Sequence, residues 1–104
     1  MRGDVYRLRS AKNAQGHEQK GLRYAVELQG PIQLSTVIVA PTSTRAAPAV
    51  FRPDIDLGGT TTKVLVDQMA AVDGELRLGG MVGRLSAHEM VEVDLALRLL
   101  LGLF

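Results

Sequence analysis

The β-branched run Ser35–Ala40 constrains the fold of this chain more than any other stretch. Its residues favour an extended strand, and its apolar positions follow one another without alternating, so we expect burial on both faces. A strand of this kind belongs in the centre of a sheet. Pro41 has no backbone N–H to donate, so we expect the chain to leave the sheet there. The hydroxyl groups of Thr42, Ser43 and Thr44 then either cap a turn or face a ligand at the strand end.

Other strands are expected on both sides of this central one. Apolar or alternating patterns predict them at Val5–Leu8, Leu22–Leu28, Ala49–Arg52, Thr61–Asp67 and Met81–Leu85. Proline, aspartate and glycine make Pro53–Gly59 a turn-rich connection. Val72–Leu78 fits either a short helical turn or an irregular loop.

A C-terminal helix is the best-marked element in the sequence. Ser86 and Glu89 are spaced as a capping box, in which the two side chains satisfy free N–H groups at the start of a helix. Gly102 marks its end. His88 falls in the first turn, where we expect a solvated residue rather than a ligand.

The apolar residues of this helix cover more than one stripe. The main stripe is Met90, Val93, Leu97 and Leu100 or Leu101, and the residues partly outside it are Leu95, Leu99 and Leu103. This wide arc favours burial against a second subunit, giving a homodimer, although a curved sheet would also accommodate it.

The length of 104 residues, with 46% hydrophobic and 22% charged residues, predicts one small globular domain spanning residues 1–104. The expected fold class is mainly β with a C-terminal α-helix, a small antiparallel β-barrel. No apolar run is long enough to cross a bilayer, and no secretory signal opens the chain. We therefore expect a cytoplasmic protein with no membrane partner.

The chemistry available to this chain is limited by its residue types. Cysteine is absent, and the two histidines, His17 and His88, are far apart, so we expect no metal and no cofactor. The net charge is only +1, but residues 1–23 carry six Lys or Arg against two acidic residues. A basic quarter of this kind favours local binding of a short polyanion.

The loop Gly16–Arg23 concentrates the reactive groups. It holds an imidazole, a carboxylate, an amide, an ammonium and a guanidinium within eight residues. A solvated connection is one interpretation. Arg23, however, opens an apolar strand, so its guanidinium is expected to be anchored and aimed, which favours an anion site.

Several of these segments, in this order, resemble the MazF/PemK family of bacterial toxins, whose fold is an SH3-like, CcdB-like barrel. The segments that carry the resemblance are Arg2–Tyr6, Gly16–Arg23, Val37–Ser43, Val64–Gln68, Val82–Ser86 and Val93–Leu97. The resemblance implies a sequence-specific endoribonuclease of a type II toxin–antitoxin module. It also implies single-stranded RNA as substrate (mRNA, or rRNA or tRNA) and a MazE-like antitoxin as partner.

The implied reaction is attack of the ribose 2′-hydroxyl on the adjacent phosphate, which leaves a cyclic phosphate and a 5′-hydroxyl. Arg23 and Thr42 match the two active-site positions of the family. Arg23 fits stabilisation of the developing charge and Thr42 fits positioning. His17 and Glu18 are candidates for proton transfer, although Glu18 fits a salt bridge equally well. The expected substrate-binding residues are Gln19, Lys20, Ser43, Thr44, Asp67 and Gln68.

Three departures from the family pattern are visible. Tyr24 follows the arginine where the family usually has proline, the Gln29–Leu34 connection is shorter, and Leu65 stands where some members carry a second arginine.

Two other classes of protein share this kind of barrel. A CcdB-like toxin that binds DNA gyrase without catalysis would not need the Arg23 and Thr42 constellation, and a peptide-binding SH3-like module would need more aromatic residues.

Overall fold

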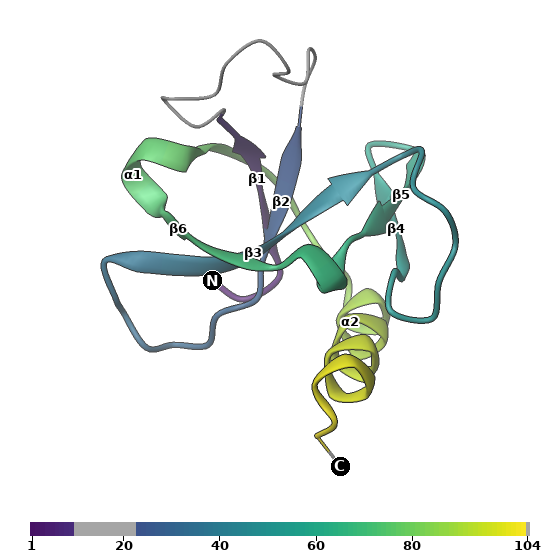
Figure 1. Cartoon of the computed structure of the whole chain (residues 1–104). Helices are drawn as coiled ribbons and strands as arrows, with labels where there is room; N and C mark the ends of the chain where they lie inside the picture. Colours follow the sequence, from purple (N-terminus) through teal and green to yellow (C-terminus); the bar gives the residue numbers. More distant parts are fainter. Residues whose placement is uncertain (10–22, 104) are drawn as a thin grey trace, which may run out of the picture.

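The computed structural model describes residues 1–9 and 23–103 as a curved antiparallel sheet with a helix at one end (Figure 1). The elements are β1 Asp4–Leu8, β2 Tyr24–Glu27, β3 Thr36–Ser43, β4 Asp54–Leu57, β5 Thr60–Val64, a short 3₁₀ turn η1 Val66–Gln68, β6 Ala70–Asp73, α1 Gly74–Arg77, β7 Leu78–Arg84 and α2 Ala87–Leu101. The predicted fold class, mainly β with a C-terminal helix, is confirmed. No helix within the described ranges combines the length and apolar composition needed to cross a bilayer.

Strand β3 is central, as its sequence predicts. The strand order is β4-β5-β3-β2-β1-β7, and β6 also pairs with β3. All pairs are antiparallel. The expected burial on both faces holds only for the middle of the strand, because Val39 and Ala40 are buried whereas Ile38 is 40% exposed.

The expectation that the chain leaves the sheet at Pro41 is wrong. Strand β3 continues to Ser43, with Pro41 opposite Ala25 of β2 and Thr42 opposite Val64 of β5. Proline lacks only the donor, and its carbonyl oxygen accepts a hydrogen bond from Leu65 N at 2.8 Å. Pro41 therefore lies where β3 changes its neighbour from β2 to β5.

The strand predicted at Ala49–Arg52 is also wrong, because this segment forms a turn and the strand is Asp54–Leu57. Here Ile55 is buried between exposed Asp54 and Asp56. Leu57 pairs with Thr60, so Gly58 and Gly59 form a two-residue hairpin turn with positive φ values of 62° and 87°. Two glycines suit this turn because they adopt positive φ without strain.

Within Val72–Leu78, the helical-turn alternative is confirmed, since the short helix α1 follows the end of β6. Two strand boundaries differ from their predictions. Strand β7 begins earlier than predicted, at Leu78. The predicted strand Thr61–Asp67 ends at Val64 and is followed by η1.

Helix α2 begins and ends where predicted. Ser86 accepts a hydrogen bond from Glu89 N while the Glu89 carboxylate accepts one from Ser86 N, and Gly102 closes the helix with a φ of 69°. The second carboxylate oxygen of Glu89 accepts from Asp56 N at 2.7 Å, which ties the helix start to β4. Burial raises the pKa of Glu89, but these hydrogen bonds outweigh burial and leave the pKa below its ordinary value.

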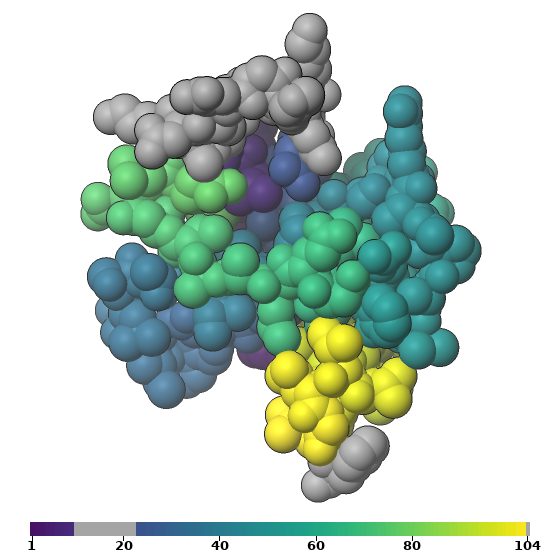
Figure 2. Space-filling model, in the orientation of Figure 1, coloured from purple at the N-terminus to yellow at the C-terminus, as the bar shows by residue number. Residues whose placement is uncertain are grey.

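The buried stripe of α2 is shorter than predicted. Val93 and Ala96 lie in the main core with residues such as Val26 and Val64, and Met90 and Leu97 pack against it. The predicted stripe ended with Leu100 or Leu101, but both residues are exposed, so neither is buried against the sheet. Both residues belong to the last turn of α2, at the side of the molecule where the C-terminal residues gather (Figures 1 and 2).

The capping box gives a direct test of how much this helix start contributes. Ser86→Ala removes the acceptor for Glu89 N, so we expect the free energy of unfolding to fall by about 1 kcal/mol in urea denaturation. Ser35→Ala, at an exposed position, should change it by less than about 0.5 kcal/mol. An equal loss in both variants would contradict the role of the cap.

Candidate active site

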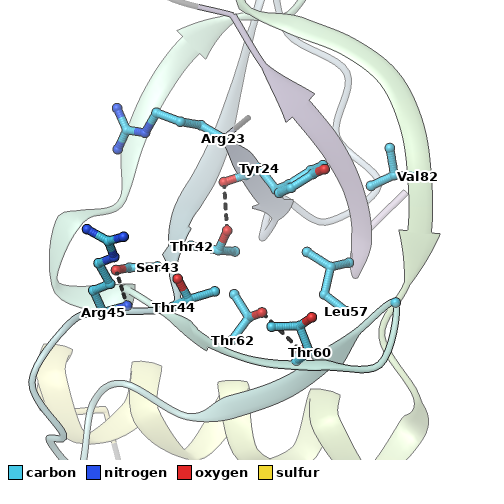
Figure 3. A pocket seen from close by; sticks show the side chains of 11 residues that line it. Arg23, Tyr24, Thr42, Ser43, Thr44, Arg45, Leu57, Thr60, Thr62 and Val82 are labelled. Atoms are coloured by element: carbon cyan, nitrogen blue, oxygen red, sulfur yellow. Dashed lines mark hydrogen bonds between the residues drawn. The ribbon is translucent and has the colours of Figure 1, made fainter. Parts of the chain in front are cut away.

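An open pocket lies between the start of β2, the end of β3, the β4–β5 hairpin and β7. Its volume is about 930 Å³. It is lined by Arg23, Tyr24, Thr42, Ser43, Thr44, Arg45, Leu57, Gly58, Thr60, Thr62 and Val82 (Figure 3). The lining combines guanidinium groups, many hydroxyl groups and a few apolar side chains, a composition that suits a polar anionic ligand.

Thr42 lies at the centre of this pocket. It is only 9% exposed, and its hydroxyl donates a hydrogen bond to the carbonyl oxygen of Tyr24 at 3.2 Å (Figure 3). Pairing of β2 with β3 brings the two residues together, since the next pair in the ladder joins Ala25 and Pro41. The bond orients the Thr42 oxygen and leaves its lone pairs able to accept from a ligand.

Ser43 and Thr44 differ in what their hydroxyls do. The Ser43 oxygen accepts hydrogen bonds from Arg45 N at 3.1 Å and Ala46 N at 3.0 Å. Ser43 therefore caps the turn after β3, which is one of the two roles expected for this hydroxyl cluster, and it still lines the pocket. Thr44 is exposed at the pocket.

The two arginines of the pocket lie on the same side of Thr42 in the view of Figure 3. Arg23 directly precedes β2, and its carbonyl accepts from Leu8 N at 2.8 Å, which anchors its backbone to β1. Neither Arg23 nor Arg45 forms a salt bridge within residues 1–9 and 23–103. The described lining contains no carboxylate or imidazole, so this side of the pocket is cationic.

Some lining residues were not expected from the sequence. Arg45, Thr60 and Thr62 belong to the pocket, and Thr62 is buried with its hydroxyl donating to Thr60 O at 3.0 Å. The Gly58–Gly59 hairpin signal would have predicted β5, and alternation along it places Thr60 and Thr62 on one face. No local signal places Arg45 there.

Asp67 and Gln68 are not among the residues that line the pocket. They lie on η1, where Asp67 accepts two hydrogen bonds from Arg52, at 3.0 Å from Nε and 2.9 Å from Nη2. The same guanidinium donates to Ala47 O at 3.1 Å. Hydrogen bonding to Arg52 lowers the pKa of Asp67. The pair therefore fastens the loop after β3 to η1.

The remaining predicted site residues come from the segment that precedes Arg23. His17, Glu18, Gln19 and Lys20 lie outside the described residues. His88 is exposed in the first turn of α2 and does not line the pocket. In the described part of the chain, no group of three or more His, Asp or Glu side chains is placed to hold a metal ion.

Comparison with known proteins identifies the family. Residues 1–101 match the model of the PemK-like, MazF-like toxins of type II toxin–antitoxin systems. This chain belongs to that family. A protein of Mycobacterium tuberculosis that is provisionally named a toxin is 43% identical over 104 residues, covering 99% of this chain and 98% of its own.

Solved structures share the fold of this MazF-like toxin. An endoribonuclease from a mycobacterial species, in complex with its cognate antitoxin, has a TM-score of 0.79 at 19% identity, covering 100% of this chain and 96% of its own. The toxin MazF-mt6 of Mycobacterium tuberculosis has a TM-score of 0.77 at 17% identity, with coverages of 97% and 98%. MazF of Deinococcus radiodurans has a TM-score of 0.74 at 25% identity, with coverages of 98% and 96%.

The Arg52–Asp67 pair predicts a pH-dependent contribution to the stability of this MazF-like toxin. The pKa of Asp67 is lowered in the folded state, so the pairing stabilises the protein above the ordinary value of 3.8, and this contribution is lost as the pH falls through the lower folded-state pKa. We expect Asp67→Asn to melt at a lower temperature than the wild type at neutral pH and at the same temperature well below pH 3.8.

Thermal unfolding monitored by circular dichroism at both pH values measures this difference. Glu92→Gln is the matched control, because Glu92 is exposed on α2 and has no salt bridge within the described ranges. A melting difference for Asp67→Asn that persists unchanged at acidic pH would contradict the ion pair as its cause.

Proposed function

We propose that this MazF-like toxin is a metal-independent, sequence-specific endoribonuclease acting on single-stranded RNA in the cytoplasm. The observation that carries the proposal is that Arg23 and Thr42 line one open pocket, with a second guanidinium from Arg45 and no carboxylate among its described lining residues. A phosphate would meet positive charge and hydroxyl groups there, and no negative charge from those residues. The structural neighbour named as an endoribonuclease supports the same assignment.

In the proposed reaction, the 2′-oxygen of a ribose attacks the adjacent phosphorus. The 2′-hydroxyl gives up its proton, the bond from phosphorus to the 5′-oxygen breaks, and the leaving oxygen gains a proton. The products are a cyclic phosphate and a 5′-hydroxyl, and water is not consumed in this step. The nucleophile belongs to the RNA, so the protein supplies positioning, charge and proton transfer.

Arg23 is assigned to the phosphate. Its planar guanidinium presents paired N–H groups that match two phosphate oxygens, and their positive charge stabilises the crowded, more negative transition state. Thr42 is assigned to the ribose. Its hydroxyl hydrogen is donated to Tyr24 O, so its oxygen can accept a hydrogen bond from the attacking 2′-hydroxyl and orient it.

Proton transfer is assigned to His17 and Glu18 of the loop before β2. The described lining residues include no carboxylate and no imidazole, so the group that accepts the 2′ proton must come from outside this lining. Gln19, Lys20, Ser43 and Thr44 are proposed to contact the RNA near the cleaved linkage. Gln68 remains a candidate for base recognition, whereas the Asp67 carboxylate is held by Arg52.

The proposed protein partners are a second copy of the toxin and an acidic, MazE-like antitoxin. A structural neighbour is in complex with its cognate antitoxin, which supports the second partner. An acidic segment over the pocket would pair with Arg23 and Arg45 and exclude RNA. Leu95 and Leu99 of α2 are 54% and 51% exposed, which supports their burial in a homodimer.

The nuclease assignment is tested with purified protein and a mixed RNA in EDTA, with the cleaved ends sequenced. We expect Arg23→Ala to lower kcat/KM by about 10²-fold to 10³-fold, because the phosphate loses its charge partner. Thr42→Val, which keeps the shape but removes the hydroxyl, should lower kcat more than it raises KM.

The control is His88→Ala, which should cleave as the wild type does because His88 does not line the pocket. Equal losses in Arg23→Ala and His88→Ala, or no cleavage by the wild type, would overturn the nuclease assignment. Inhibition of purified DNA gyrase by a wild type that does not cleave RNA would favour a CcdB-like toxin instead.

The homodimer is tested by size-exclusion chromatography with light scattering. Leu95→Glu places a charge on the exposed face of α2, so we expect the dimer to dissociate at micromolar concentration. Val50→Glu adds the same charge at another exposed apolar residue, in the loop after β3, and should leave the dimer intact. A monomeric wild type, or the opposite order of effects, would contradict burial of this helix face.

A further inference from the structure

Eight of the nine described arginines fall into two groups according to their partners and their place in the fold. The ninth, Arg98, is on helix α2 and has no salt bridge within the described ranges. The first group forms salt bridges with carboxylates and consists of Arg2, Arg52 and Arg84. The second group, on or near the end of the sheet that bears the pocket, consists of Arg7, Arg9, Arg23, Arg45 and Arg77. Within residues 1–9 and 23–103, no carboxylate forms a salt bridge with this second group. Cations left without a carboxylate at one end of a sheet attract an external anion.

Arg7 lies beside the pocket although it is not part of its lining. It is directly opposite Tyr24 in the β1–β2 ladder, and Tyr24 lines the pocket. Opposite residues of an antiparallel pair point to the same face, so Arg7 shares the face of Tyr24. Arg9 is the residue that follows β1, and side-chain atoms of both arginines lie within 4 Å of a Cβ built at Gly79, so the two side chains are neighbours. Both arginines are exposed. These two residues extend the positive charge of the pocket along β1 and to the residue that follows it.

The backbone of β7 makes room for these two side chains. A Cβ atom added to Gly79 would lie 3.1 Å from the Cβ of Arg7 and 3.7 Å from Nε of Arg9. A side chain at this position would therefore press on Arg7 and come into ordinary contact with Arg9. At neighbouring Gly80, an added Cβ would meet nothing within 4 Å. The glycine at position 79 thus leaves room for the Arg7 side chain beside Arg9.

Arg9 is also anchored by hydrogen bonds. Its Nη1 donates to Glu75 O at 3.1 Å, its backbone N donates to Arg77 O at 2.7 Å, and Arg77 Nε donates to Arg9 O at 2.8 Å. One N–H of the guanidinium is used, which leaves the other donors of the exposed group for a ligand. An anchored guanidinium loses less side-chain entropy on binding than a free one.

We propose that Arg7 and Arg9 form a second phosphate subsite, which holds the RNA strand that flanks the cleaved linkage. This inference rests on the proposed nuclease function, because it takes single-stranded RNA as the ligand. Phosphates recur at every nucleotide, so a strand in the pocket presents further phosphates to cations along its path. A guanidinium fork fits two oxygens of such a phosphate. The subsite contributes affinity without contacting the reacting atoms.

The subsite is tested by fluorescence anisotropy with a cleavage-resistant 2′-O-methyl oligonucleotide of about 15 nucleotides and a short one of about 4 nucleotides. We expect Arg7→Ala and Arg9→Ala each to weaken binding of the long strand by about threefold to tenfold at low salt. Each should also reduce the slope of log affinity against log salt by about 0.7, the value for one lost phosphate contact in a single strand. Binding of the short strand should change little.

Arg98→Ala is the matched control, because it removes the same charge from α2, far along the chain from the pocket. A second pair of variants tests the placement: Gly79→Ala should weaken binding of the long strand, and Gly80→Ala should not. If Arg98→Ala weakens binding as much as Arg9→Ala, the subsite does not exist. The same follows if neither Arg7→Ala nor Arg9→Ala changes the long-strand affinity. Poly-glutamate tests the alternative ligand. If Arg7 and Arg9 are needed to bind poly-glutamate but not to bind the oligonucleotide, the two arginines belong to a site for an acidic protein partner.

Cleavage of a long natural RNA by the wild type separates the two hypotheses. Cleavage by a wild type whose long-strand binding is insensitive to Arg7→Ala and Arg9→Ala would overturn the subsite and leave the nuclease function in place. Absence of cleavage, with long-strand binding that still depends on both arginines, would overturn the nuclease function and support the subsite.

Discussion

The pairing of β3 with three other strands is the constraint on which the rest of the structure depends. The first half of β3 pairs with β6, its middle with β2, and its last residues with β5. The neighbour of β3 changes from β2 to β5 at Pro41, whose carbonyl oxygen accepts a hydrogen bond from Leu65 N. Because β3 reaches past Pro41, Thr42 lies between the β2 strand and the β4–β5 hairpin, and the pocket opens there.

The polar groups of the molecule are divided between structural and ligand-facing roles. Arg52 and Asp67 hold the loop after β3 against η1, and Glu89 holds the start of α2 against β4. Arg23 and Arg45 have no such carboxylate partner in the described ranges and border the pocket. At the position where some family members carry a second arginine, this chain has buried Leu65, and its second pocket guanidinium comes from Arg45 instead.

The candidate site was only partly predictable from the sequence. Arg23 and Thr42 were assigned by resemblance to a family, and the structure brings both to one pocket together with Ser43 and Thr44. Their catalytic roles stay a prediction. Asp67 was expected to contact substrate, but its partner Arg52 is fifteen residues away in sequence, and no local pattern announces a salt bridge between a turn and a loop.

The sequence by itself determined the local elements: the extended segment Ser35–Ala40, the capping box at Ser86 and the end of α2 at Gly102. These follow from propensities and hydrogen bonds between residues close in the chain. Only the tertiary structure decided where β3 ends, which leucines of α2 are exposed, and that Arg7, Arg45 and Thr62 lie at or beside one pocket. The physical reason is that strand pairing and burial join distant residues, and no short window of sequence contains both partners.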